Sequence, residues 1–166
     1  GHMKHDFDAP VERAGSDSTK WAKYAGRDPD VMPLWVADMD FAAPPGVTEA
    51  LTEVVNRAVH GYYADTGSWA TALTEWMARR HGLSIDPAWV SPTPGVVSGL
   101  GLILQAVTAP GDEVVVFPPA YHAFRKIILA NERRILDAQL TLRQGRHMMD
   151  LDALAEKLTP RTKIVF

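Results

Sequence analysis

The sequence has 166 residues, of which 46% are apolar and 22% charged, with a formal net charge of −3 and no cysteine. This composition is ordinary for a globular domain with a substantial core. Without a basic surplus a nucleic-acid groove is not expected, and without cysteine there are no disulfides, thiolate nucleophiles or thiolate metal sites.

The apolar run over residues 96–109 is too short to cross a bilayer, and no signal-peptide pattern precedes it. We therefore expect a cytoplasmic protein with no membrane or nucleic-acid partner. Residues 1–3, Gly-His-Met, have the pattern of a cloning remnant and are left out of the fold prediction.

An irregular arm is predicted over residues 4–44, with a short helix over 18–24. Prolines at both ends keep the segment from Met32 to Pro45 extended. Asp38 and Asp40 lie there among large apolar groups, and such carboxylates need partners. The segment therefore either lines a polar site or pairs with cations elsewhere, and an acidic surface loop is the alternative. As alternate residues of an extended segment, the two carboxylates are expected to face opposite ways.

Two helices are predicted next. The first has apolar residues at helical spacing from Val47 to Ala58, with Pro45 in its first turn and Gly61 just past its end. The second is predicted to be capped by Ser68 and closed by Gly82. A short strand is expected at residues 88–90.

A turn at Gly95 is predicted to open a helix over residues 96–108. The first N–H groups of a helix are free, and together with the helix dipole they form an anion site. We predict that Gly95, Val96 and Val97 present their N–H groups to a phosphate; an ordinary strand-to-helix turn is the alternative. Gly99 and Gly101 each cost the helix roughly 1 kcal/mol relative to alanine, which indicates that a backbone or a ligand approaches closely.

Strands and helices alternate through the rest of the chain. Glu113–Phe117 is a continuous apolar strand, as expected where both faces of a parallel sheet are covered. The elements that follow are a helix over 120–130, a strand over 134–140, a helix after Asp150 with Leu151, Leu154 and Leu158 inward, and a strand over 163–166. This order predicts an α/β fold, a mainly parallel sheet with helices on both faces, preceded by the irregular arm.

The ligand edge of this sheet can also be predicted. Ligands of open α/β sheets bind outside the carboxyl ends of the strands. The Gly95 turn follows one predicted strand and Tyr121 follows another, so both are expected at that edge. Tyr121 is predicted to stack on a flat ring whose phosphate lies at Gly95–Val97, and a core aromatic in the first helical turn is the alternative.

Several segments carry a family resemblance. They are Leu34-Trp35-Val36-Ala37-Asp38-Met39-Asp40-Phe41, His60-Gly61-Tyr62, Pro92-Thr93-Pro94-Gly95-Val96-Val97 and Pro118-Pro119-Ala120-Tyr121-His122-Ala123-Phe124. In order and spacing the sequence resembles the MalY/PatB-type cystathionine β-lyases, which are aminotransferase-like, fold-type I pyridoxal-phosphate (PLP) enzymes. The resemblance runs from about Phe7 to Phe166.

The resemblance implies a cofactor, PLP, and a homodimer. The residues implied to bind PLP are Gly95, Val96 and Val97 at its phosphate, Tyr121 on its pyridine ring, and Tyr62, which reaches the cofactor of the partner subunit. Val36 and Ala37 are implied to lie beside a small amino-acid substrate. Residues 4–44 would be the substrate-side arm and part of a small domain, and residues 45–166 the first part of the PLP-binding large domain.

The implied activity is β-elimination on cystathionine or related cysteine S-conjugates, which yields a thiol, pyruvate and ammonia. No catalytic residue is identified, because the family's Schiff-base lysine is expected beyond Phe166. An aminotransferase remains an alternative, and so does a non-catalytic homologue that acts by binding or dimer contact. The histidines are isolated and no metal site is predicted.

Overall fold

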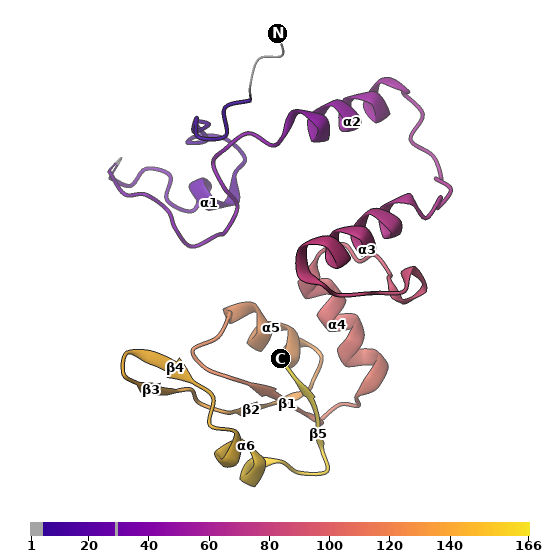
Figure 1. Cartoon of the computed structure of the whole chain (residues 1–166). Coiled ribbons are helices and arrows are strands. Elements are labelled where there is room, and N and C mark those ends of the chain that lie inside the picture. Colours follow the sequence, from indigo (N-terminus) through magenta and orange to yellow (C-terminus); the bar gives the residue numbers. More distant parts are fainter. Residues whose placement is uncertain (1–4, 29) are drawn as a thin grey trace. The chain divides into compact units, whose positions relative to one another are not determined.

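The computed structural model describes residues 5–28 and 30–166, so the predicted cloning remnant lies outside the described residues. The chain divides into two compact units, one ending at Asp65 and the other running over Thr66–Phe166 (Figure 1). This division concerns compactness, and the predicted boundary at residue 44 stays a prediction.

The first unit is the irregular arm followed by one long helix. Its helices are α1 (Thr19–Ala22) and α2 (Pro45–Asn56). The two ends of the arm meet at an isolated antiparallel bridge between Pro10 and Phe41. Helix α2 begins at the predicted proline, but the predicted extension to Ala58 is wrong because that residue has φ +54°. None of the residues of α2 is buried.

The second unit begins with α3 (Ser68–His81). Gly82 closes it as predicted, in the left-handed conformation with its N–H on the carbonyl of Ala78. The predicted cap is wrong, because Gly67 occupies the cap position and Ser68 is the first helical residue. The predicted strand at 88–90 is also wrong. A 3-10 turn, η1 (Pro87–Trp89), stands there, and the Asp86 side chain accepts a hydrogen bond from the Ala88 N–H.

The remainder of the second unit has the predicted alternation. Its elements are α4 (Val96–Val107), β1 (Glu113–Val116), α5 (His122–Ala130), β2 (Arg134–Asp137), β3 (Thr141–Arg143), β4 (Arg146–Met148), α6 (Leu151–Lys157) and β5 (Thr162–Val165). Strands β2, β1 and β5 form a parallel sheet in that order. The antiparallel hairpin β3–β4 was not predicted from the sequence, and its turn has Gln144 and Gly145 at positive φ.

The core lies on β1. Val114 and Val116 face Leu104 of α4 and Ile128 of α5, and all four side chains are almost completely buried. Val115 points to the opposite face and is equally buried. Right-handed crossovers on either side of β1 place α5 and α6 on opposite faces, as Figure 1 shows. The prediction of a parallel sheet covered on both faces is confirmed.

The predictions for Gly101 in α4 and for the cap and leucines of α6 have different outcomes. A Cβ on Gly101 would lie 3.0 Å from Cδ1 of Ile127, so a close neighbour exists there, but it is a side chain of α5 and not the predicted backbone or ligand. On α6, Asp150 caps the helix as predicted by accepting from the Ala153 N–H. Leu151, Leu154 and Leu158 were predicted to face inward; Leu154 is half-buried, but Leu151 and Leu158 are exposed, so the prediction is wrong for these two.

A buried arginine fixes the direction of α4. Arg133, directly before β2, is 7% exposed and donates to the carbonyls of Leu104 and Thr108, at 3.2 and 2.7 Å. These carbonyls belong to the last turn of α4 and its cap. The carboxyl end of α4 therefore lies at the amino edge of the sheet, and its amino end points toward the carboxyl edge.

Candidate functional site

The Gly95 turn has a conformation that only glycine adopts readily. Gly95 has φ +102° and ψ 151°. Thr93 holds both of its backbone groups: the Gly95 N–H donates to the Thr93 carbonyl at 2.8 Å, and Thr93 Oγ1 donates to the Gly95 carbonyl at 3.1 Å. The Gly95 N–H is thus engaged within the turn, whereas the sequence analysis expected it to be a free donor.

The free donors lie one residue further on. Within the described residues, no acceptor meets the N–H groups of Val96, Val97 and Ser98, the first turn of α4. Val96 is exposed and Val97 half-buried. Apart from Gly95 and its chain neighbours, no atom of the described residues lies within 4 Å of the position a Cβ on Gly95 would take, so the space beside the turn is open. Such a turn with three free donors fits a phosphate.

Gly99 serves the same turn. A Cβ on Gly99 would lie 3.0 Å from Thr93 Oγ1. The absence of a side chain therefore leaves room for the threonine hydroxyl that holds the Gly95 carbonyl. A close neighbour therefore exists at Gly99, but it is the side chain of Thr93 and not the predicted backbone or ligand.

Tyr121 stands at the same edge of the sheet. It is the cap residue of α5, shortly after the carboxyl end of β1, and is 54% exposed. The core-aromatic alternative is therefore wrong. Gly95 was predicted at this edge because a strand was expected directly before it, but the support for its position is a different one. In the described residues no strand precedes the turn, and it is the direction of α4 that points the turn toward this edge.

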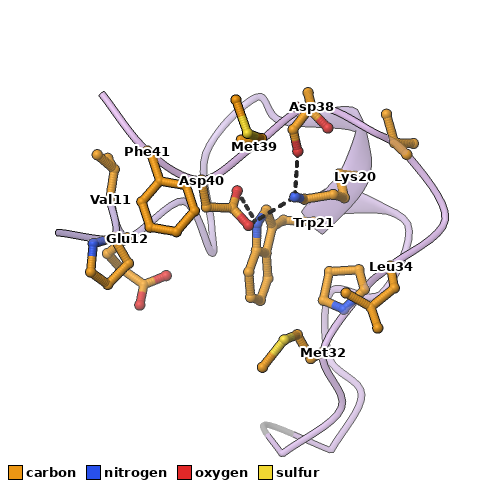
Figure 2. Close-up of a pocket in the computed structure, with 13 residues that line it drawn as sticks. Val11, Glu12, Lys20, Trp21, Met32, Leu34, Asp38, Met39, Asp40 and Phe41 are labelled. Atoms are coloured by element: carbon orange, nitrogen blue, oxygen red, sulfur yellow. Dashed lines mark hydrogen bonds and ion pairs between the residues drawn. The ribbon is translucent and has the colours of Figure 1, made fainter. Parts of the chain in front are cut away.

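The first unit contains a hollow of about 650 Å³ (Figure 2). Its wall is mostly apolar, with side chains such as Met32, Leu34 and Phe41, and Val36 contributes to it. Ala37, the other residue implied to lie beside the substrate, is exposed and does not line the hollow.

Asp40 is the centre of the polar wall of this hollow. Its Oδ1 accepts from Arg13 Nη1 at 2.9 Å and from Trp21 Nε1 at 3.0 Å, and its Oδ2 pairs with Lys20 Nζ at 2.8 Å. Figure 2 shows the Lys20 ammonium between Asp40 and the Asp38 carbonyl, to which it donates at 2.7 Å. The bond from Lys20, then that from Trp21, lowers the pKa of Asp40.

The two carboxylates share one cation. Arg13 Nη2 pairs with Asp38 at 2.8 Å, and the hydrogen bond that Arg13 donates to Asp38 is the main cause that raises the pKa of Arg13. Asp38 and Asp40 therefore converge on one guanidinium, and the expectation that they face opposite ways is wrong. Their need for cationic partners was predictable from the sequence. The partners were not, because Arg13 and Lys20 lie 18 to 27 residues away from them.

The predicted site residues divide between the units. Val36, Ala37 and the exposed Tyr62 belong to the first, and Gly95–Val97 and Tyr121 to the second. Their meeting in one site stays a prediction. Across residues 5–28 and 30–166, no group of three or more His, Cys, Asp or Glu side chains could hold a metal ion. No helix in that part of the chain is long and apolar enough to span a membrane.

Comparison with known families and structures identifies the class of protein. The family described as aminotransferase class I and II matches residues 29–166, and the chain belongs to this family. The predicted resemblance is confirmed. The fold is that of the fold-type I PLP enzymes.

Individual proteins similar to this chain agree with the family assignment. The chain is 39% identical over 163 residues to the cystathionine β-lyase PatB of Bacillus subtilis, and 30% identical over 164 residues to the protein MalY of Escherichia coli. These matches cover 97% and 96% of the chain, and 42% of each relative. Among solved structures, cystalysin from Treponema denticola, which contains a PLP cofactor, matches with a TM-score of 0.88 and 30% identity. That match covers 98% of the chain and 43% of cystalysin. The chain thus spans less than half the length of these relatives.

Proposed function

We propose that this chain forms the first part of a PLP-dependent carbon–sulfur lyase. The reaction is β-elimination on cystathionine or a related cysteine S-conjugate, which gives a thiol, pyruvate and ammonia. The observation that carries the proposal is the first turn of α4, where three free N–H donors follow a glycine-only turn at the carboxyl edge of the sheet. The similarity to PatB supports the lyase reaction in particular.

The chain's own residues have separate tasks at the cofactor. Val96 and Val97 donate their N–H groups to the phosphate, and the Gly95 turn holds the start of α4 in place. The exposed ring of Tyr121 stacks on the pyridine ring. When bound, PLP supplies an electron sink that stabilises negative charge at the substrate Cα.

Two further tasks belong to the first unit. We propose that Val36 and Ala37 lie beside the amino-acid substrate, and that the Tyr62 hydroxyl donates to the cofactor of the partner subunit in a homodimer. The complete exposure of Tyr62 leaves its hydroxyl available for such a contact. Asp40 holds the segment that carries Val36 through its bonds to Arg13, Lys20 and Trp21.

An aminotransferase is the second candidate. It is supported by the 32% identity over 161 residues to LL-diaminopimelate aminotransferase of Nitratidesulfovibrio vulgaris, 41% of whose length is covered. Both reactions would use the same cofactor cradle at the start of α4. A non-catalytic role in binding or dimer contact is the remaining alternative.

One experiment distinguishes these functions. The complete protein, loaded with PLP, is incubated with cystathionine, and pyruvate and free thiol are measured with and without a 2-oxo acid. A lyase releases pyruvate and thiol in equal amounts without the oxo acid. An aminotransferase requires the oxo acid and converts it to an amino acid. A protein that neither retains PLP nor turns over substrate would contradict both enzyme proposals.

A further inference from the structure

Three aromatic rings run from the core of the second unit to the exposed edge. The ring centroids of Tyr121 and Phe124 are 5.6 Å apart, with an interplanar angle of 88°. Phe124 in turn lies 5.5 Å from Phe166 at 63°. Both pairs have the edge-to-face arrangement that aromatic quadrupoles favour.

The inner end of this series is anchored. Phe166 packs against the core cluster formed by Leu104, Val114, Val116 and Ile128. Its N–H donates to the Val115 carbonyl at 2.9 Å, which ties it to the carboxyl end of β1. Phe124 is half-buried on the first turn of α5, and its N–H donates to the Tyr121 carbonyl at 3.1 Å. The outer ring, Tyr121, is therefore connected to the core through one side chain.

We propose that Phe124 is a positioning residue that fixes the ring plane of Tyr121 for stacking on a flat heteroaromatic ligand. The inference rests on the proposed function, in which that ligand is the pyridine ring of PLP. An exposed tyrosine samples several rotamers, and ordering it on binding costs affinity. The perpendicular contact with Phe124 orders the ring before the ligand arrives. His122 also contacts Tyr121, at 4.8 Å, but is itself exposed and provides a weaker support.

The test uses the complete protein and three variants at these positions. Phe124→Leu keeps an apolar side chain but removes the ring, Phe124→Tyr restores the ring, and His122→Ala is the matched control beside the same tyrosine. The dissociation constant of PLP and the induced circular dichroism of the bound cofactor are measured. We expect Phe124→Leu to weaken binding roughly two- to tenfold, the range typical of one aromatic pair, and to reduce the dichroism. Phe124→Tyr should restore both, and His122→Ala should change them less.

A double variant separates positioning from general stability. If Phe124 acts through Tyr121, then Phe124→Leu has no further effect on PLP affinity in a Tyr121→Ala background. A Phe124→Leu effect that persists in that background overturns the inference. The inference is also overturned if Phe124→Leu binds PLP as tightly as the unchanged protein while Tyr121→Ala binds it weakly. The proposed function survives that result. If Tyr121→Ala itself binds PLP normally, the stacking role in the proposed function fails, and the inference fails with it.

Discussion

Replacing Gly95 with alanine perturbs the cofactor cradle through the backbone alone. The position of the new Cβ is empty within 4 Å, so the substitution causes no collision. Its cost comes from φ +102° and ψ 151°, a region that is essentially restricted to glycine and costs a residue with a side chain roughly 1–3 kcal/mol. If the variant keeps the conformation of the turn, the free energy of unfolding falls by this amount. If the turn relaxes in the cofactor-free protein, the same amount is lost from PLP binding, which corresponds to an affinity about 5- to 150-fold lower.

Both outcomes are measurable in the complete protein. Denaturant unfolding of the cofactor-free form gives the loss of stability, and PLP titration followed by absorbance gives the loss of affinity. The two losses together should amount to about 1–3 kcal/mol. Gly46→Ala is the matched control, because Gly46 also has open space at its Cβ position but an ordinary helical φ. If Gly95→Ala is as stable and binds PLP as tightly as this control, the turn does not hold a phosphate in the described conformation.

Three other perturbations have defined outcomes. The pKa of Asp40 is lower in the folded protein than in the unfolded chain, where it is about 4. Its ion pairs therefore stabilise the fold above that pH, and this stabilisation is lost as the pH falls through the lower folded pKa. Asp40→Asn should remove part of the acid dependence of the free energy of unfolding, and an unchanged dependence would contradict this. Arg133→Met removes the donor from the part-buried carbonyls of Thr108 and Asn131 and should cost roughly 1–3 kcal/mol in denaturant unfolding. Arg134→Met, which changes the exposed neighbouring arginine, should be nearly neutral. Tyr62→Phe should weaken PLP retention by roughly 1.5–3 kcal/mol without lowering the melting temperature, and unchanged affinity would exclude the contact across the dimer.

The parallel sheet was predictable because its signal is local. A run such as Val114-Val115-Val116 has no polar position, so both of its faces must be covered, and it lies between segments with helical spacing. The strand expected at residues 88–90 had the same apolar composition. Asp86 and Pro87 favour a turn instead of a strand. The Asp86 side chain accepts a hydrogen bond from the Ala88 N–H, and Pro87 begins the 3-10 turn.

The contacts that shape the site were less predictable because they join distant residues. Gly95 and Tyr121 were predicted at one edge of the sheet, but for Gly95 the prediction depended on a strand at residues 88–90, where the chain forms a 3-10 turn. Arg133 orients α4, but in the sequence nothing distinguishes it from the adjacent Arg134, which is exposed. The role of Thr93 depends on its side chain reaching Gly95 across Pro94 and on the gap at Gly99, which residue spacing alone does not show.

A crystal structure of the complete protein with PLP tests the central claim most directly. We expect phosphate oxygens at about 2.7–3.2 Å from the backbone nitrogens of Val96 and Val97, with the pyridine ring against the exposed face of Tyr121. Gly95 should keep its positive φ. A phosphate bound away from the first turn of α4, with Tyr121 not in contact with the cofactor ring, would contradict the account.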